Sequence, residues 1–326
     1  MRIPPAYTIT KEMLFLITKI EAERLYFSSL NLQDLIKENI QRISLLKSSL
    51  FSARIEGNTL KMSDFELGKE EEEKKEEVFN IVKAIEYIDK NIKKGVLTKN
   101  IISKLHLLVM KNISPDAGHV RLEVSAIFNE AGIAVYMPPP PSQIPKLLNE
   151  LLEYINSEKE FPLTSAFIAH LIFEKIHPFL DGNGRVGRLL ISAVLKINGW
   201  DFSFAVPFEE YLDEHKSEYY FHLNNGLQKT NDYLLFMLEA FYQQIQKIKE
   251  QIDEENAKEA NLFLPPRQEE ILNIIKDHVV VSFDMIRRRF LQVPERTLRW
   301  DLKKLLDKKL IERSGETKGS YYRIKK

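Results

Sequence analysis

Apolar residues recur at intervals of three and four through most of the chain up to residue 255, a spacing typical of amphipathic helices. Asn198 and Gly199 directly follow one such segment and are typical of a helix end. The charged run 69–77 is interpreted as a solvated loop leading into a helix start, where acidic side chains suit the helix dipole; an acidic tail is the alternative. The pattern predicts a mainly α-helical fold, with helices over 12–29, 32–51, 77–93, 144–155, 163–176, 189–197, 208–226 and 232–255.

The pattern changes between Gly118 and Tyr136, where two short β-prone runs, 124–128 and 132–136, flank a turn-forming Asn-Glu-Ala-Gly segment. This arrangement predicts a β-hairpin. Four consecutive prolines, 138–141, follow the second run. We interpret them as a stiff, extended connection that leaves the hairpin, and a ligand for a polyproline-binding domain is the alternative.

The end of the chain has a pattern of its own after Pro265 and Pro266, which mark a domain boundary. Three helices are predicted over 267–277, 282–290 and 294–310, followed by a two-stranded wing at 311–313 and 321–324. This is the order of a winged helix-turn-helix domain, whose third helix enters the major groove of DNA. That helix carries Arg296, Arg299, Lys303 and Lys304. DNA is therefore one candidate partner of 264–326, and a protein-interaction module is the alternative.

Charge and composition change this picture in two ways. The 326 residues contain 47 Lys and Arg and 47 Asp and Glu, but residues 264–326 contain 16 basic and 9 acidic residues, a net charge of +7. The tail is therefore basic and the rest acidic. The absence of cysteine excludes disulfides, thiolate zinc sites and a cysteine nucleophile. We find no apolar run of membrane-spanning length and no secretory signal, so a cytoplasmic location without membrane association is expected.

The most informative segment is 177–188, with the sequence HPFLDGNGRVGR between two predicted helices. Gly182, Asn183 and Gly184 can adopt conformations that point successive backbone N–H groups into one anion-binding concavity. A helix begins directly afterwards, and the positive end of its dipole adds to the same place. Arg185 and Arg188 lie about one turn apart on that helix and add two planar donors. The segment therefore suits a polyphosphate.

Two further side chains give this segment candidate chemistry. The imidazole of His177 can accept a proton from a hydroxyl near neutral pH. The carboxylate of Asp181, beside a phosphate pocket, can hold Mg²⁺ while the metal keeps several waters. A base, a metal ligand and a phosphate cradle indicate nucleotidyl or phosphoryl transfer to a hydroxyl. The chain has neither a P-loop motif nor a GxGxxG motif after a strand.

HPFLDGNGRVGR resembles the signature of the Fic family, His-x-Phe-x-(Asp/Glu)-Gly-Asn-Gly-Arg-x-x-Arg, and every defined position is filled. The resemblance extends from about residue 47 to about residue 242. It implies a helical core with a β-hairpin flap and an enzyme that transfers AMP from ATP to a Ser, Thr or Tyr hydroxyl of a target protein. It also implies Mg²⁺ as the metal. The flap, 124–136, resembles the family's docking site for the target, which adds to it as a strand. Self-modification and a homodimer are further possibilities in this family.

The resemblance assigns roles within the signature. His177 is the base, Asp181 holds Mg²⁺ between the α- and β-phosphates, and Phe179 is a buried anchor of the loop. Gly182, Asn183 and Gly184 form the anion hole, with Asn183 on the α-phosphate. Arg185 contacts the inner phosphates and Arg188 the γ-phosphate. Val186 and Gly187 complete the implied ATP-binding segment.

A second motif occupies 52–58, SARIEGN. It resembles the inhibitory helix of Fic proteins, (Ser/Thr)-x-x-x-Glu-(Gly/Asn), through Ser52, Glu56 and Gly57. In that family the glutamate pairs with the second signature arginine, so we expect Glu56 to bind Arg188 and to displace the γ-phosphate of ATP. Read without the resemblance, a glutamate before glycine at a helix end is an ordinary solvated residue.

These observations predict an N-terminal helical region with the inhibitory motif (1–98), a Fic catalytic domain (99–245), a helical linker (246–263) and a winged helix-turn-helix domain (264–326). We expect an autoinhibited protein adenylyltransferase. The alternatives are a phosphodiesterase that removes AMP from modified proteins, and a DNA-binding regulator with a vestigial Fic core. His170 and Glu174 lie one turn apart and are interpreted as support for the His177 loop, with a metal pair as the alternative.

Overall fold

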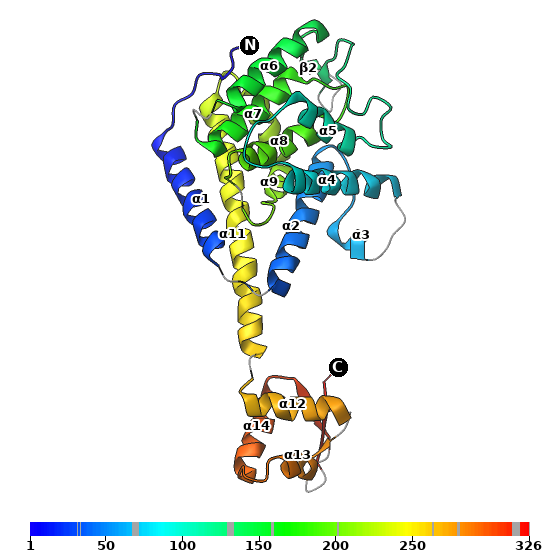
Figure 1. Cartoon of the computed structure of the whole chain (residues 1–326), viewed down its shortest axis with the longest axis vertical. Helices are drawn as coiled ribbons and strands as arrows, with labels where there is room; N and C mark the ends of the chain where they lie inside the picture. The colour runs from blue at the N-terminus through cyan, green and yellow to red at the C-terminus, as the bar shows by residue number, and fades with distance from the viewer. Residues whose placement is uncertain are drawn as a thin grey trace. The chain divides into compact units, whose positions relative to one another are not determined.

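The computed structural model describes residues 1–30, 32, 34–66, 72–128, 134–157, 160–200, 202–262, 264–278, 281–314 and 320–325. The chain divides into two compact units, Met1–Ile252 and Asp253–Lys326, which are taken separately below (Figure 1). The predicted mainly α-helical fold is confirmed. Within the described residues, no helix has the length and apolar character needed to cross a membrane.

The first unit is built of helices and carries one small β-hairpin in its described part (Figure 1). In chain order its elements are α1 (Lys11–Ser29), α2 (Asp34–Ile55), α3 (Met62–Glu66), α4 (Glu72–Asn91), α5 (Lys99–Val109), β1 (Ile127–Phe128), β2 (Ala134–Tyr136), the 3-10 helix η1 (Pro141–Gln143), α6 (Ile144–Ile155), α7 (Pro162–Ile176), α8 (Asn183–Ile197), α9 (Phe208–Glu214), α10 (Lys216–Asn225) and α11 (Thr230–Leu262), whose end lies in the second unit.

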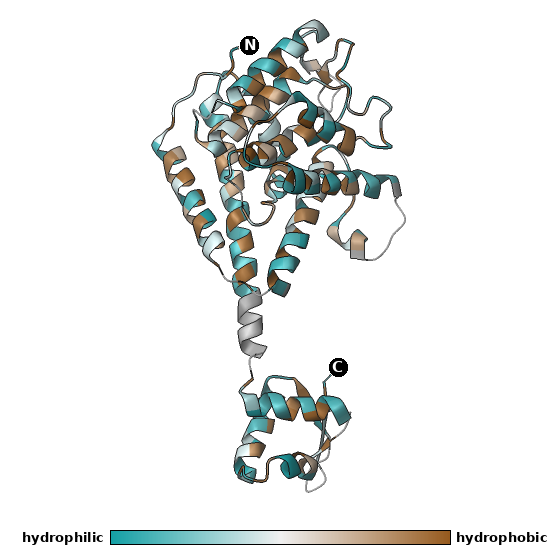
Figure 2. Cartoon of the chain, in the orientation of Figure 1, coloured by the Kyte–Doolittle hydropathy of each residue, from teal (hydrophilic) through white to brown (hydrophobic). Residues whose placement is uncertain are grey.

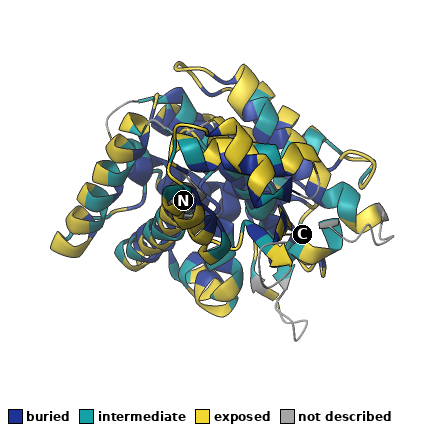
Figure 3. Ribbon diagram, turned by 90° about the horizontal axis from the view of Figure 1, so that it is seen from below, coloured by how far each residue is buried: buried dark blue, intermediate teal, exposed yellow. Residues whose placement is uncertain are grey.

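The core of the first unit forms around α7 and α8. Every residue of α7 from Leu163 to Ile176 is buried, as expected of a helix whose residues are apolar on nearly all sides. Helix α8 is enclosed as well, with no exposed residue, whereas outer helices such as α4 and α6 combine apolar positions, drawn brown in Figure 2, with exposed polar ones. Figure 3 accordingly shows buried ribbon inside and exposed faces outside. Because α7 and α8 are enclosed, the short loop that joins them is held by the most rigid part of the fold.

Several boundaries differ from those that the hydrophobic spacing predicts, including the start of α4, at Glu72 instead of 77, and the end of α11, at Leu262 instead of 255. Helix α2 continues past residue 51 to Ile55, because Ala53 and Ile55 are themselves buried in the core. Helix α8 begins at Asn183, before the apolar repeat starts at 189. The predicted helix 208–226 is broken at His215, whose φ and ψ of −117° and 38° separate α9 from α10.

The hairpin is short. Strands β1 and β2 are antiparallel, with Ile127 opposite Tyr136 and Phe128 opposite Ala134. The predicted turn at 129–132 lies outside the described residues. Pro138, Pro139 and Pro140 are in an extended segment, and Pro141 begins η1, which leads into α6; this agrees with the interpretation of a stiff connection.

Besides the end of α11, the described part of the second unit contains the helices α12 (Pro266–His278), α13 (Phe283–Arg289) and α14 (Glu295–Asp307), and the strands β3 (Val281–Ser282), β4 (Ile311–Ser314) and β5 (Tyr321–Ile324). The strand order is β3-β5-β4, and both pairings are antiparallel. The sequence predicts two strands, whereas the described residues form three, since Val281 and Ser282 pair with β5 before α13 begins. This unit has its own apolar core, which includes Ile271, Leu302 and Tyr322.

Candidate active site

The loop between α7 and α8 carries the residues to which the sequence analysis assigns chemistry. His177 directly follows α7 and has the left-handed backbone angles φ 49° and ψ 60°. Gly182 precedes α8 with φ 77°, and a Cβ at this position would lie 2.7 Å from the sulfur of Met110. Any other residue at 182 would be both strained and crowded, so glycine allows the loop to turn into α8.

Buried contacts fix the middle of the loop. Phe179 is fully buried, and its ring stacks on His106 with 3.7 Å between centroids. The side-chain amide of Asn183 accepts a hydrogen bond from the Phe179 N–H and donates one to the Phe179 carbonyl, both at 2.9 Å. The amide is thereby used by the loop, which leaves the backbone N–H of Asn183 to face an anion. His106 also lies 3.0 Å from the Asp181 carbonyl.

The sequence analysis gives His106 no role. It belongs to α5, which is far from the signature in the sequence, so no local spacing connects the two. Its Nδ1 accepts a hydrogen bond from the Gly118 N–H, so the ring links the signature loop to the segment that leads to the hairpin.

The start of α8 has the features of an anion site. The helix begins at Asn183, and its first backbone N–H groups, from Asn183, Gly184 and Arg185, have no acceptor within the helix. The positive end of the helix dipole adds to these donors. Arg185 and Arg188 follow on the first turns, and both side chains are buried. The structure thus brings together the backbone donors and the two arginines of the signature.

Residues at the end of α2 bind Arg188. Its Nη2 lies 2.9 Å from the Glu56 Oε1 and donates to the Ser52 carbonyl at 2.8 Å, and its Nε donates to the Ser52 hydroxyl at 3.0 Å. The ion pair that the sequence analysis expects between Glu56 and Arg188 is therefore present. Arg188 is only 1 % exposed. Burial lowers the pKa of this guanidinium, but the Glu56 carboxylate raises it, and the net direction is upward.

The Glu56 carboxylate also touches the first turn of α8. A Cβ added to Gly184 would clash with the Glu56 Oε1, so the carboxylate lies directly against the helix start. Gly57 follows in the turn that ends α2, with φ 107°. The side chain of Glu56 thus occupies the anion site made by the α8 backbone and Arg188.

A second carboxylate pairs with the other signature arginine. The Arg185 Nη1 lies 2.6 Å from the Glu77 Oε1, and its Nη2 lies 3.2 Å from the Asp181 Oδ1. The other oxygen of Glu77 accepts a hydrogen bond from the Asn58 amide at 2.8 Å. Asn58 follows Glu56 and Gly57 directly in the chain, so the two carboxylates on the two arginines are physically linked.

Sequence reasoning missed Glu77. It is the last residue of the charged run 69–77, which we interpreted as solvated, and residues 67–71 lie outside the described part of the chain. The side chain of Glu77 is 18 % exposed. The only signal in the sequence was its position at the start of a predicted helix. One acidic residue among several at a helix start does not indicate a specific cationic partner.

His177 has the properties of a neutral base. Burial of the ring lowers its pKa to about 4, so the imidazole is uncharged at neutral pH and can accept a proton. Its Nδ1 is buried, and no hydrogen-bond partner for it is found among the described residues. Its carbonyl accepts a hydrogen bond from the Nε of Arg121 at 2.8 Å.

Asp181 is the only carboxylate in the signature, and it faces solvent, with 67 % of its side chain exposed. Within the described residues there is no cluster of three or more acidic or histidine side chains of the kind that holds a metal ion by itself. Mg²⁺ bound to a nucleotide needs only one or two carboxylates, because phosphate oxygens and waters complete its shell. A solvent-facing carboxylate beside the anion site fits that requirement.

Two of the predicted ATP-binding residues are not brought to the site. Val186 is fully buried in the core. A Cβ at Gly187 would clash with the Glu174 carboxylate and crowd Phe173, so Gly187 permits close packing of α8 on α7. Their side of α8 faces the protein interior, and they have a packing role.

The buried polar residues of α7 belong to the core. His170 lies 2.8 Å from the Tyr233 hydroxyl through Nδ1 and 3.1 Å from the Tyr219 hydroxyl through Nε2. Since both ring nitrogens are hydrogen-bonded to tyrosine hydroxyls, His170 is not available as a metal ligand. This disfavours the alternative in which His170 and Glu174 form a metal pair. Burial raises the pKa of Glu174 to about 8, so this carboxyl is largely protonated at neutral pH.

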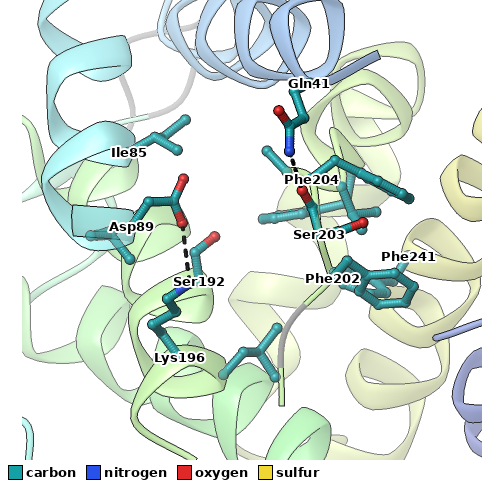
Figure 4. Close-up of a pocket in the computed structure, with 14 residues that line it drawn as sticks. Gln41, Ile85, Asp89, Ser192, Lys196, Phe202, Ser203, Phe204 and Phe241 are labelled. Carbon is teal, nitrogen blue, oxygen red and sulfur yellow. Dashed lines mark hydrogen bonds and ion pairs between the residues drawn. The ribbon is translucent and has the colours of Figure 1, made fainter. Parts of the chain in front are cut away.

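A cavity of about 330 Å³ lies between α2, α4, α8 and the segment 202–208 (Figure 4). Ser192 and Lys196 of α8 line it, together with Gln41 of α2 and several aromatic rings. Gln41 donates to the Ser203 carbonyl at 2.8 Å. No signature residue is among its lining residues, so this cavity is separate from the anion site.

Comparison with known proteins agrees with this geometry. Residues 96–195 match the model of the Fic/DOC family. A probable protein adenylyltransferase of Aquifex aeolicus is 45% identical over 67 residues, which are 20% of this chain and 21% of that protein. Protein adenylyltransferase Fic of Aedes aegypti is 25% identical over 220 residues, 63% of this chain and 42% of that protein. The chain thus spans about a fifth to two fifths of the length of these curated relatives.

Solved structures share the fold. A Fic family protein from Desulfovibrio desulfuricans matches with a TM-score of 0.73 at 23% identity, over 98% of each chain. Fic-1 from C. elegans matches with a TM-score of 0.60 at 20% identity, over 74% of this chain and 72% of that one. The loop, the anion site and the α7–α8 core all lie in or beside the matched region. Residues 96–195 are therefore similar to the Fic/DOC family, and the chain shares the fold of solved Fic proteins.

Proposed function

We propose that this chain is an autoinhibited protein adenylyltransferase, which transfers AMP from ATP to a Ser, Thr or Tyr hydroxyl of a target protein or of itself. The observation that carries the proposal is the anion site at the start of α8, where backbone N–H groups, Arg185 and Arg188 meet beside the neutral His177. The relatives from Aquifex aeolicus and Aedes aegypti, which are named adenylyltransferases, support it. The test is the intact mass of the Glu56→Gly chain, from which the inhibitory carboxylate is removed, after incubation with ATP and Mg²⁺; it should increase by one adenylyl group per modified site.

The chain's own residues suffice for the polar steps of this reaction. The hydroxyl oxygen of the target attacks the α-phosphorus, His177 accepts the hydroxyl proton, and the bond from the α-phosphorus to the bridging oxygen breaks to release pyrophosphate. The α8 backbone donors and Arg185 hold the inner phosphates, and Arg188 holds the γ-phosphate. Mg²⁺, held by Asp181 and the phosphates, would neutralise charge on the leaving pyrophosphate.

Glu56 supplies the inhibition in this proposal. Its carboxylate and the γ-phosphate are both anions that require Arg188, and the carboxylate already lies 2.9 Å from the Nη2. Because Glu56 is tethered at the end of α2, its local concentration is high and ATP competes poorly. ATP that binds without the γ-phosphate contact places its α-phosphate out of line with the target hydroxyl.

Glu77 strengthens the inhibition by occupying Arg185, so Glu77→Gln should tighten ATP binding about threefold to tenfold. Glutamine keeps the shape and can still accept from Asn58, but it removes the anion 2.6 Å from the Arg185 Nη1, which is then free for phosphate. Equilibrium dialysis with labelled ATP measures the change. Glu76→Gln, the same charge change one residue earlier, is the control. Weaker binding by Glu77→Gln would show that Glu77 orients Arg185 for phosphate instead.

Removal of AMP from modified proteins is the runner-up activity. The Glu56 carboxylate lies at the anion site, where it could orient a water toward a phosphodiester. Pre-labelled protein that loses its label in the presence of the wild-type chain, and keeps it with Glu56→Gly, would favour this activity.

We further propose that the second unit is a winged helix-turn-helix domain that binds DNA through α14. Leu298, Leu302 and Leu305 bury one side of this helix, whereas Arg296, Arg299 and Lys303 are exposed on another. These three cations, spaced by three and four residues, lie on a single face. An exposed basic face on the third helix is suited to a phosphate backbone, which disfavours a purely structural role for the cations.

The affinity of the full chain for duplex DNA should fall steeply with salt concentration, because bound cations release counterions. The double replacement Arg296→Ala and Lys303→Ala should make the negative slope of log K against log salt shallower by about two. Fluorescence anisotropy with a labelled random duplex measures both, and Lys146→Ala on the first unit is the control. Binding that is absent or independent of salt would favour a protein-interaction role for this unit and disfavour a DNA-binding regulator.

A further inference from the structure

Arg121 is a buried arginine that the proposed chemistry does not use. Its residue is 2 % exposed, and among the described residues no carboxylate lies within ion-pair distance of its guanidinium. Burying a cation without a counter-ion is unfavourable unless hydrogen bonds to its N–H groups compensate for the lost solvation. Three backbone carbonyls supply that compensation, and their positions explain why the arginine is there.

The three carbonyls belong to three different segments. The Nε of Arg121 donates to the His177 carbonyl at 2.8 Å, Nη1 donates to the Glu123 carbonyl at 2.8 Å, and Nη2 donates to the Pro139 carbonyl at 2.6 Å. Its own backbone N–H donates to the Pro178 carbonyl at 3.0 Å. Glu123 and Pro139 stand on either side of the hairpin 124–136. One guanidinium therefore joins both ends of the hairpin to the residue that carries the proposed base.

A second contact joins the same two parts. The Tyr136 hydroxyl, at the end of β2, donates to the Lys175 carbonyl at 2.9 Å, and the Lys175 ammonium lies 4.4 Å from the centre of the Tyr136 ring. Lys175 precedes His177 by two residues at the end of α7. The hairpin base is thus held against α7 at two points.

The surface beside these contacts is apolar and open. Leu122 is 90 % exposed, Val124 is 69 % exposed and Met137 is 60 % exposed. In the described part of the chain no strand pairs with the residues from 122 to 126, which precede β1. An extended polypeptide that carries a hydroxyl side chain could use both the free main-chain groups and the apolar side chains.

We propose that Arg121 is a positioning residue that sets the distance between a docked acceptor strand and the His177 imidazole, an inference that rests on the proposed AMP transfer. The geometry requires arginine, because only its planar guanidinium offers several donors in one fixed fork. Lysine would keep the charge, but its three donors are on one nitrogen and cannot replace three separate guanidinium nitrogens, each of which bonds a carbonyl of a different segment. Movement of the hairpin relative to His177 by about 1 Å would misplace the hydroxyl and cost on the order of 10²-fold in rate.

The test uses the full chain with Glu56→Gly as the parent and Arg121→Lys as the variant. The acceptors are short extended peptides with a single Ser, Thr or Tyr, labelled from ATP that carries the label at the α-phosphate. Arg121→Lys should lower kcat/KM for the peptides about 10²-fold and raise their KM. The Kd for ATP, from equilibrium dialysis, should stay within about twofold, because Arg121 contacts none of the groups that are proposed to hold the phosphates. Arg42→Lys, an exposed change on α2, is the control.

Tyr136→Phe is a milder variant for the case that Arg121→Lys unfolds, which a thermal melt detects. It removes the hydroxyl bonded to Lys175 and keeps the ring, so the peptide kcat/KM should fall about threefold to tenfold at unchanged ATP affinity. Unchanged peptide labelling, or a parallel loss of ATP affinity and labelling, would overturn the positioning role. A parent that labels neither peptides nor itself would overturn the proposed transfer, and this inference with it.

Discussion

Replacement of Glu56 by glycine is expected to raise the rate of adenylyl transfer on the order of 10²-fold above wild type. The change removes the anion from Arg188 and from the first turn of α8, so both become free for the γ-phosphate. The magnitude is that of one well-placed donor to reacting phosphates. The measurement is the initial rate of label incorporation from Mg²⁺-ATP under saturating nucleotide.

Two further variants separate the causes of this gain. Glu56→Gln keeps the volume of the side chain but removes its charge, so it should give a gain between wild type and Glu56→Gly. Arg188→Ala removes the partner of the inhibitory carboxylate and the phosphate contact together, so its rate should stay low. If Glu56→Gly is no faster than wild type, the inhibitory role of Glu56 is wrong. A variant that gains transfer but loses de-adenylylation would move the phosphodiesterase alternative to first place.

Replacement of His177 by alanine in the Glu56→Gly chain should lower transfer by about 10² to 10⁴-fold, the range for loss of a general base. The affinity for ATP should stay nearly the same, because the phosphates are held by the α8 backbone and by Arg185 and Arg188. Paired measurements of ATP binding and transfer rate check both parts. His119→Ala, a change at an exposed histidine, is the control, and full activity of His177→Ala would contradict the mechanism.

The sequence predicted the parts of this site that are close together in the chain. The signature 177–188 is a single loop and helix start, so its spacing alone placed the backbone donors, Arg185 and Arg188 in one concavity. The contact between Glu56 and Arg188 is distant in sequence and followed from the family resemblance. From its neighbouring residues alone, Glu56 is predicted to be solvated, because nothing near it in the sequence indicates a cationic partner.

The remaining contacts come from tertiary packing and left no local signal. His106, Glu77 and Arg121 lie on α5, on α4 and before the hairpin, and each reaches the signature across the fold. Some predicted helix boundaries were wrong for a related reason. Apolar spacing alone starts α8 at 189, and the glycine segment predicts a start directly after Gly184. The helix begins at Asn183, where the bonds between Asn183 and Phe179 and the left-handed Gly182 start the first turn.

The central claim is that this chain moves an adenylyl group, and the most direct measurement is the position of the transferred phosphate. The Glu56→Gly chain is incubated with Mg²⁺ and ATP labelled either at the α-phosphate or at the γ-phosphate, and protein-bound label is counted with His177→Ala in the same background as the control. Adenylyl transfer predicts protein label from the α-labelled nucleotide alone, and its loss in the His177→Ala control. Protein label from the γ-phosphate, or no protein label from either nucleotide, would contradict it.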